Sequence, residues 1–180
     1  MKIKPSLGPV LNRPDEQLPT KSAKAAETSP FKLKEILVPT DFSEASMKAL
    51  QYALSLAEKF GARITLIHVV KPISNSGGMM VPSEILEMKG ALVKSGWKKL
   101  ESLCNQTIKS AIASNTVVEV GKPYVKIVAA AKTHKTDLII IATHGYTGLK
   151  HFLIGSTAER VVRHAPCPVL TVREPEQDFV

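Results

Sequence analysis

Apolar residues in this chain gather in five short runs, separated by longer stretches in which they recur every three or four positions. Short runs of aliphatic and β-branched residues are typical of strands that are buried on both faces of a sheet. The clearest run extends from Leu138 to Ala142 without a polar residue. We expect strands at residues 36–38, 63–70, 116–120, 138–142 and 168–172.

The stretches between these runs have the period of amphipathic helices. The first has an apolar face from Ala49 to Phe60, and Gly61 is placed to end it in a left-handed conformation. In the second, Ser83 is placed as a cap, and Gly90 and Gly96 are expected to weaken or break the first half. We expect helices at residues 43–60, 83–114, 123–134 and 156–164.

Strands and helices alternate along the chain from residue 35 onwards. A strand, a helix and a second strand within about 35 residues form a right-handed βαβ unit. Its repetition predicts an α/β fold, an open sheet of five mostly parallel strands with helices on both faces. In such a sheet, ligands bind beyond the carboxyl ends of the strands, where the strand order reverses.

The beginning of the chain has a different composition. Residues 1–31 contain five prolines and no sustained periodicity, so we expect a disordered extension, a folded domain at 32–174 and a tail at 175–180. Residues 1–34 carry seven basic and three acidic residues, which is half of the net charge of +8. The folded part is therefore only mildly basic, and we do not expect nucleic-acid binding unless the basic tail provides it.

Composition also bears on location and on metal chemistry. No apolar run approaches the roughly 18 residues that span a bilayer, and no apolar segment of a signal peptide follows Lys2 and Lys4. Cys104 and Cys167 lie far apart, without a CxxC pair or a histidine at zinc-ligand spacing. We expect a cytoplasmic protein with no membrane segment, no disulfide framework and no metal site.

The connection between the fourth strand and the last helix contains three glycines in residues 143–155, followed by Ser156 and Thr157. Such a loop brings backbone N–H groups and the positive end of a helix to one place, which suits phosphate. Its spacing is not that of a Walker A loop, GxxxxGK[ST], nor of a Rossmann GxGxxG, which follows the first strand. The commonest phosphate motifs are therefore excluded.

Four segments carry a recognisable pattern: Ile36-Leu-Val-Pro-Thr-Asp-Phe-Ser43, Leu66-Ile-His-Val69, Asp137-Leu-Ile-Ile-Ile-Ala-Thr-His-Gly145, and Gly155-Ser156 with Pro166-Cys-Pro-Val169. In these segments the chain resembles the universal stress protein family, from residue 34 to about 173. The nucleotide-binding branch of that family is marked by GxxG, nine residues and then G[ST]. This chain has Ala142-Thr-His-Gly145, nine residues and Gly155-Ser156, so Ala142 replaces the first glycine and narrows the approach of ribose or phosphate.

The resemblance implies an adenine nucleotide alpha hydrolase-like, Rossmann-like sheet with strand order 3-2-1-4-5. It implies a stress-response regulator that binds ATP or AMP, with Mg²⁺ on the phosphates, and a homodimer formed through the C-terminal strand. The residues implied to bind the nucleotide are, for adenine and ribose, Pro39, Thr40, Asp41 and Val69; for ribose and α-phosphate, Ala142, His144 and Gly145; and for the phosphates, Gly155, Ser156 and Thr157.

Structural explanations remain open for several of these residues. Asp41 and Glu44 can form a capping pair, Ser156 can cap the last helix, and His68 in a buried strand is by default a satisfied core histidine. No catalytic motif is visible, and we expect no Lys or Arg at the site to stabilise a transferring phosphoryl group. We therefore assign no catalytic residue and expect at most slow ATP hydrolysis or autophosphorylation. The alternative is an interaction protein of the same fold that binds no nucleotide.

Overall fold

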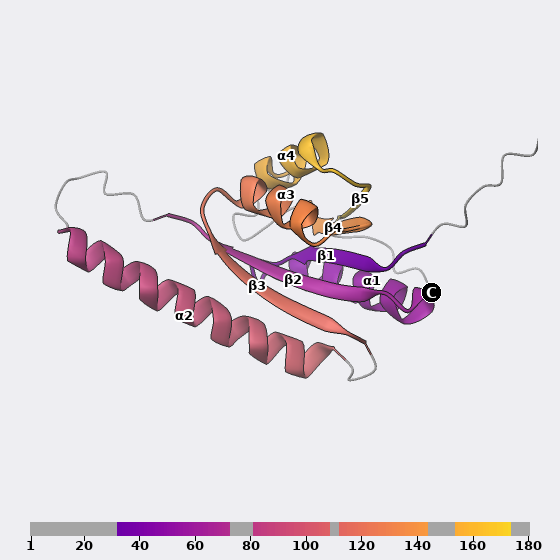
Figure 1. Cartoon of the computed structure of the whole chain (residues 1–180), viewed down its shortest axis with the longest axis horizontal. Coiled ribbons are helices and arrows are strands. Elements are labelled where there is room, and N and C mark those ends of the chain that lie inside the picture. The colour runs from indigo at the N-terminus through magenta and orange to yellow at the C-terminus, as the bar shows by residue number, and fades with distance from the viewer. Residues whose placement is uncertain (1–31, 73–80, 109–111, 144–153, 174–180) are drawn as a thin grey trace, which may run out of the picture. The chain divides into compact units, whose positions relative to one another are not determined.

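The computed structural model describes residues 32–72, 81–108, 112–143 and 154–173, and the predicted extension and C-terminal tail lie outside this part. Five strands form one sheet in the order β3-β2-β1-β4-β5, and every pairing is parallel (Figure 1). The predicted fold class and strand order are confirmed. The strands are β1 (Glu35–Pro39), β2 (Arg63–Val70), β3 (Ser114–Val120), β4 (Leu138–Ala142) and β5 (Val169–Val172).

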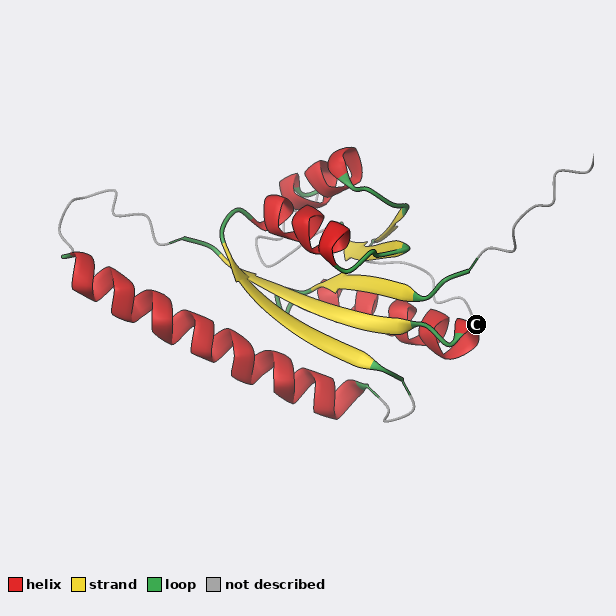
Figure 2. Cartoon of the chain, viewed as in Figure 1, coloured by secondary structure: helices red, strands yellow, loops and turns green. Residues whose placement is uncertain are grey.

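Helices cover both faces of the sheet, as Figure 2 shows. Side chains alternate across β1, so Ile36 and Val38 pack under α1 and α2, while Leu37 packs under α3 and α4. Because both faces are covered, residues 36–39 of β1 and all of β4 are apolar instead of alternating with polar residues. The helices are α1 (Glu44–Phe60), α2 (Pro82–Thr107), α3 (Pro123–Thr133) and α4 (Ser156–His164).

The start of α1 differs from the expected capping pair. Ser43 is the N-cap residue, and its hydroxyl accepts a hydrogen bond from the Ser46 N–H at 3.3 Å. Asp41 lies outside the helix, so of the two explanations left open for Asp41 the capping pair with Glu44 is wrong. The predicted end is confirmed, because Gly61 has φ 65° and closes the helix in the left-handed region.

The helix α2 is continuous, so Gly90 and Gly96 do not break it. Its N-cap residue is Val81 instead of Ser83, and the Glu84 carboxylate accepts the Val81 N–H at 3.2 Å. Gly96 is buried where α2 approaches the sheet, and a Cβ atom there would lie 3.1 Å from His68 Cδ2. This close approach explains the glycine inside the helix.

The predicted C-terminal end of the same helix is also wrong. The helix α2 ends at Thr107, and Ser114, which we expected at its end, is the first residue of β3. Ile108 and Ile112 nevertheless pack against the hydrophobic cluster beneath α1 and α2. The apolar period therefore continues beyond the helix, which is why the pattern overestimates its length.

Candidate functional site

A pocket of the described domain lies at the carboxyl ends of the central strands. β1 pairs with β2 on one side and with β4 on the other, so the expected adjacency of β1 and β4 is confirmed. The chain leaves β1 toward α1 on one face of the sheet and leaves β4 toward α4 on the other face. The strand order thus reverses between β1 and β4, the place where open α/β sheets bind ligands. A cavity of about 560 Å³ lies there, a volume typical of small-molecule sites.

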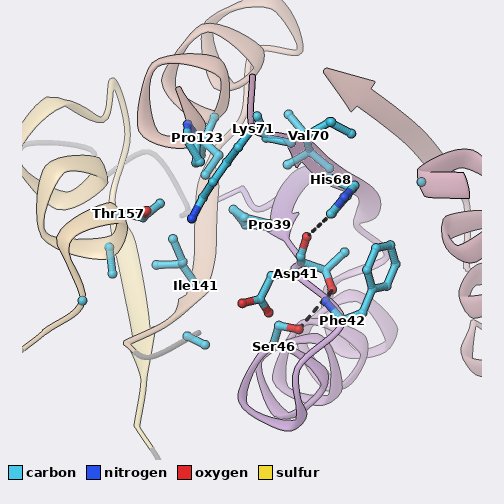
Figure 3. A pocket seen from close by; sticks show the side chains of 18 of the residues that line it. Pro39, Asp41, Phe42, Ser46, His68, Val70, Lys71, Pro123, Ile141 and Thr157 are labelled. Atoms are coloured by element: carbon cyan, nitrogen blue, oxygen red, sulfur yellow. Dashed lines mark hydrogen bonds between the residues drawn. The ribbon is translucent and has the colours of Figure 1, made fainter. Parts of the chain in front are cut away.

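The lining of this pocket brings together segments that are far apart in the sequence (Figure 3). Of the ten residues expected at the site, His144 and Gly145 lie outside the described residues. The other eight all line the cavity: Pro39, Thr40, Asp41, Val69, Ala142, Gly155, Ser156 and Thr157.

The first wall of the pocket is the turn from β1 into α1, centred on Thr40. This side chain is only 6% exposed. Its hydroxyl accepts the Phe42 N–H at 3.0 Å and forms a 3.0 Å hydrogen bond with Ser46 Oγ. The Thr40 N–H donates to the Ile67 carbonyl oxygen at 2.9 Å, which ties the turn to β2. The polar groups of Thr40 are therefore satisfied within the wall, and they fix the shape of the turn.

Asp41 and Phe42 complete this turn. The carboxylate of Asp41 points into the pocket (Figure 3) and accepts hydrogen bonds from the N–H and the hydroxyl of Ser43, at 3.1 and 2.5 Å. Phe42 has φ 65°, a conformation that costs a residue with a side chain about 1–2 kcal/mol. Its ring packs against His68, with centroids 4.6 Å apart. Backbone strain of this kind is frequent at binding sites, because the surrounding contacts must hold it.

His68 lies in β2 directly behind this turn. Its Nδ1 is 2.9 Å from the Thr40 carbonyl oxygen, and because a carbonyl can only accept, we assign the proton to Nδ1. The side chain is half-buried and lines the pocket. His68 is therefore a satisfied histidine, as expected, and it also supports the wall.

The second wall is the start of α4, which is joined to the end of β4. The Gly155 N–H donates to the Thr143 carbonyl oxygen at 2.7 Å. A Cβ atom on Gly155 would lie 2.9 Å from that same oxygen, so a side chain here requires the backbone to move. Gly155 has φ −58°, so the close contact, and not an unusual backbone angle, accounts for the glycine.

The N-terminus of α4 faces the pocket, since Ser156, Thr157 and Ala158 line it. Gly155 is the N-cap residue and has no side chain to cap the helix, so the interpretation of Ser156 as a cap is wrong. The first turn of a helix has N–H groups without intrahelical partners and carries a partial positive charge. This wall therefore offers hydrogen-bond donors to an anion in the cavity.

Lysines at the pocket are a feature that the sequence did not predict. Lys71, which directly follows β2, lines the cavity, and so does Lys99 from α2. The expectation of no Lys or Arg at the site is therefore wrong. The Lys99 ammonium lies 5.6 Å from the centre of the Phe42 ring, within cation–π range. The position of Lys71 at a carboxyl strand end was a signal available in the sequence, whereas that of Lys99 depends on the path of α2.

Other chemistry is sparse in the described part of the chain. It holds no group of three or more His, Cys, Asp or Glu side chains placed to bind a metal ion, and no helix long and apolar enough to cross a membrane. Burial raises the pKa of the Cys167 thiol, and the negative charge of Asp137 adds to this, against a backbone hydrogen bond at Ile139 that lowers it. A raised pKa makes the thiol less reactive near neutral pH.

Comparison with known proteins shows the class of this domain. The model of the universal stress protein family matches residues 32–173, so the chain belongs to the universal stress protein family. Universal stress protein MJ0531 of Methanocaldococcus jannaschii is 34% identical over 150 residues, which cover 81% of this chain and 85% of the relative.

Solved structures agree with this membership. Protein MJ0577 of Methanocaldococcus jannaschii has a TM-score of 0.72 at 29% identity, over 82% of this chain and all of that one. A universal stress protein solved in complex with cAMP has a TM-score of 0.55 at 22% identity, over 79% of this chain and 99% of its own. At that lower identity the likeness shows the fold alone.

Proposed function

We propose that this universal stress protein binds an adenine nucleotide, ATP or AMP, in the pocket between β1 and β4, and that it acts as a stress-response regulatory module. The observation that carries the proposal is the convergence of the motif: its described residues at the end of β1, in β2, at the end of β4 and at the start of α4 surround one cavity of about 560 Å³. A universal stress protein of the same fold was solved in complex with cAMP, an adenine nucleotide, which supports the proposal. The assignment to this chain rests on its own pocket.

The base and ribose fit the wall formed by β1 and β2. Pro39 and Val69 present apolar surface at adjoining strand ends, and Asp41 adds a carboxylate that can accept hydrogen bonds from amino or hydroxyl groups. A mostly apolar surface with a few fixed polar groups is the usual composition of a small-molecule site. We therefore assign the nucleoside to this side of the pocket.

The phosphates fit the opposite wall. The first turn of α4, whose N-cap residue is a glycine, provides donors and a favourable field for an anion, together with the hydroxyls of Ser156 and Thr157. Ala142, which replaces the first glycine of the motif, is only 8% exposed and belongs to the hydrophobic cluster beneath α1. Its methyl group therefore takes little of the cavity, and we expect it to be compatible with a phosphate.

Any Mg²⁺ in this site would accompany the nucleotide. The described residues around the cavity include one carboxylate, Asp41, and no further acidic side chain. Mg²⁺ at nucleotide sites is typically held by phosphate oxygens, water and one or two carboxylates, so the donor set fits an ion brought by the ligand. We infer a binding protein and assign no catalytic step to these residues.

The proposal is tested by identifying the ligand and measuring its affinity. Mass spectrometry of the small molecules released from freshly purified protein should find an adenine nucleotide. Calorimetry on ligand-stripped protein should show binding of ATP or AMP and weaker binding of GTP. Absence of any binding by folded protein would overturn the proposal in favour of an interaction protein that uses no nucleotide.

We further propose a homodimer through β5, which is an edge strand of the sheet. The carbonyls of Pro168 and Val172 accept hydrogen bonds from β4, at 3.0 and 2.8 Å, so by alternation the backbone groups of Thr171 point to the free edge. Proline at position 171 removes only an outward donor. We predict that Thr171→Pro is monomeric by light scattering, whereas Thr171→Val stays dimeric. A dimeric Thr171→Pro variant would exclude this interface.

A further inference from the structure

Lys71 is a charged side chain at the pocket that the family motif does not include. It directly follows β2, whose last residue, Val70, accepts a hydrogen bond from the Gly121 N–H at 3.0 Å. This bond fixes the point from which the side chain starts. Figure 3 shows the side chain extending across the pocket, with its ammonium group between Pro39 and Thr157. Lys71 therefore reaches from the β2 side toward the helix terminus assigned to the phosphates.

The charge of Lys71 is not neutralised within the described part of the chain. None of the ion pairs found there includes Lys71. The other lysine at the cavity, Lys99, has its ammonium over the Phe42 ring, on the side of α2. Lys71 is thus the cation that points toward Thr157 and the phosphate wall.

We propose that Lys71 is a specificity-determining residue, which makes the pocket favour adenine nucleotides with longer phosphate chains, ATP over ADP and ADP over AMP. This inference rests on the proposed function. The N-terminal turn of α4 can satisfy one phosphate group by itself, through backbone donors that are present for every nucleotide. A mobile ammonium group adds an attraction that increases with the negative charge of the ligand, since Coulomb energy is proportional to charge.

The dependence of the effect on the negative charge of the nucleotide distinguishes this role of Lys71 from that of an ordinary surface lysine. Lys71 is exposed, so salt screens its interaction and the expected effect is moderate. A lysine far from the pocket is screened by salt, so its charge changes the affinity of every nucleotide only slightly. A lysine that contacts the outer phosphates changes the ratio of ATP affinity to AMP affinity.

The experiment compares the full-length protein with Lys71→Met, which keeps much of the length of the side chain and removes the charge. Titration calorimetry with ATP, ADP, AMP and adenosine gives four dissociation constants for each protein. We expect Lys71→Met to weaken ATP binding about three- to tenfold, AMP less than twofold and adenosine not at all, with a smaller ATP effect at high salt. Lys71→Arg should keep the preference for ATP.

The matched control is Lys132→Met, an equal change of charge on an exposed lysine in the last turn of α3. This turn lies at the opposite end of α3 from Pro123, which lines the pocket. An unchanged ratio of ATP to AMP affinity in Lys71→Met, or an equal change in Lys132→Met, would overturn the role of Lys71 and leave the proposed function standing. Failure of the unmodified protein to bind any of the four ligands would overturn both.

Discussion

The two walls of the pocket are built in different ways. At the β1 wall, Thr40 forms hydrogen bonds with Phe42, Ser46 and Ile67, so polar groups of the wall satisfy one another. At the α4 wall, the N-cap residue Gly155 has no side chain to cap the helix, and its backbone lies against the backbone of Thr143. The first wall has its partners in place, whereas the second presents donors to the cavity.

Because of this difference, we expect the first wall to contribute mainly to stability and the second mainly to binding. A wall whose polar groups are paired internally contributes to the folding free energy, and the loss of one member leaves buried partners unsatisfied. A helix terminus that faces a cavity contributes little until an anion occupies it. We therefore expect substitutions in the first wall to lower stability and those in the second to lower affinity.

The largest expected effect is that of Gly155→Ala on nucleotide affinity. The new methyl group would lie 2.9 Å from the Thr143 carbonyl oxygen, so the start of α4 must shift away from the end of β4. Overpacking of this kind costs about 1–3 kcal/mol. We expect nucleotide binding to weaken about 30-fold or more, measured by calorimetry, while circular dichroism shows an intact fold.

Gly90→Ala is the matched control for that variant. A Cβ atom at Gly90 meets nothing within 4 Å, and this residue does not line the cavity. Its affinity for nucleotide should equal that of the unmodified protein. If Gly155→Ala binds as tightly as Gly90→Ala, the α4 wall does not receive the phosphates.

Thr40→Val is expected to lower stability more than it lowers nucleotide affinity, which is the opposite of what we expect for Gly155→Ala. The side chains are similar in size, but valine leaves the Phe42 N–H without its acceptor and removes one of the two partners of Ser46 Oγ. The loss of such buried hydrogen bonds costs about 1–2 kcal/mol. Urea denaturation should show this decrease in the free energy of unfolding, with a smaller change in nucleotide affinity than Gly155→Ala causes.

Thr133→Val provides the comparison for Thr40→Val. The Thr133 hydroxyl is exposed on α3 and donates to the Ala129 carbonyl oxygen within the same helix, at 3.1 Å. Its removal should change stability by less than about 0.5 kcal/mol. Equal losses at positions 40 and 133 would mean that the hydrogen bonds of the β1 wall do not stabilise the fold.

The two walls also differ in how well the sequence predicted them. The predicted strands 63–70 and 138–142 match β2 and β4, because runs rich in β-branched and apolar residues leave few alternatives for a buried strand. The motif placed Asp41 and Gly155 at one pocket because adjacent parallel strands end at the same edge. Local details were harder: Asp41, Ser43 and Glu44 can all act in a cap, and a positive φ at Phe42 is uncommon for an aromatic residue.

The contributions of α2 to the site were the hardest to predict. Lys99 lies 57 residues beyond Phe42 in the sequence, and only the path of the helix brings its ammonium over the Phe42 ring. The glycines of α2 suggested a break because a helix pattern does not show where the sheet approaches. Gly96 lies at such an approach, whereas Gly90 faces open space.

This contrast between two glycines of one helix gives the smallest predicted effect. Glycine to alanine in an exposed helix interior stabilises a protein by about 1 kcal/mol, so Gly90→Ala should gain that amount. At Gly96 the new methyl group would lie 3.1 Å from His68 Cδ2 and 3.5 Å from Val118 Cγ1. The contact offsets the gain in helix propensity, so Gly96→Ala should change stability by less than about 0.5 kcal/mol in urea denaturation.

Gly96→Ala should also affect binding. It should displace the His68 ring that supports Thr40 and weaken nucleotide binding about twofold, because the first wall moves slightly. Equal stabilisation by the two substitutions, with unchanged affinity in both, would mean that α2 is loosely packed on the sheet and does not help to shape the pocket.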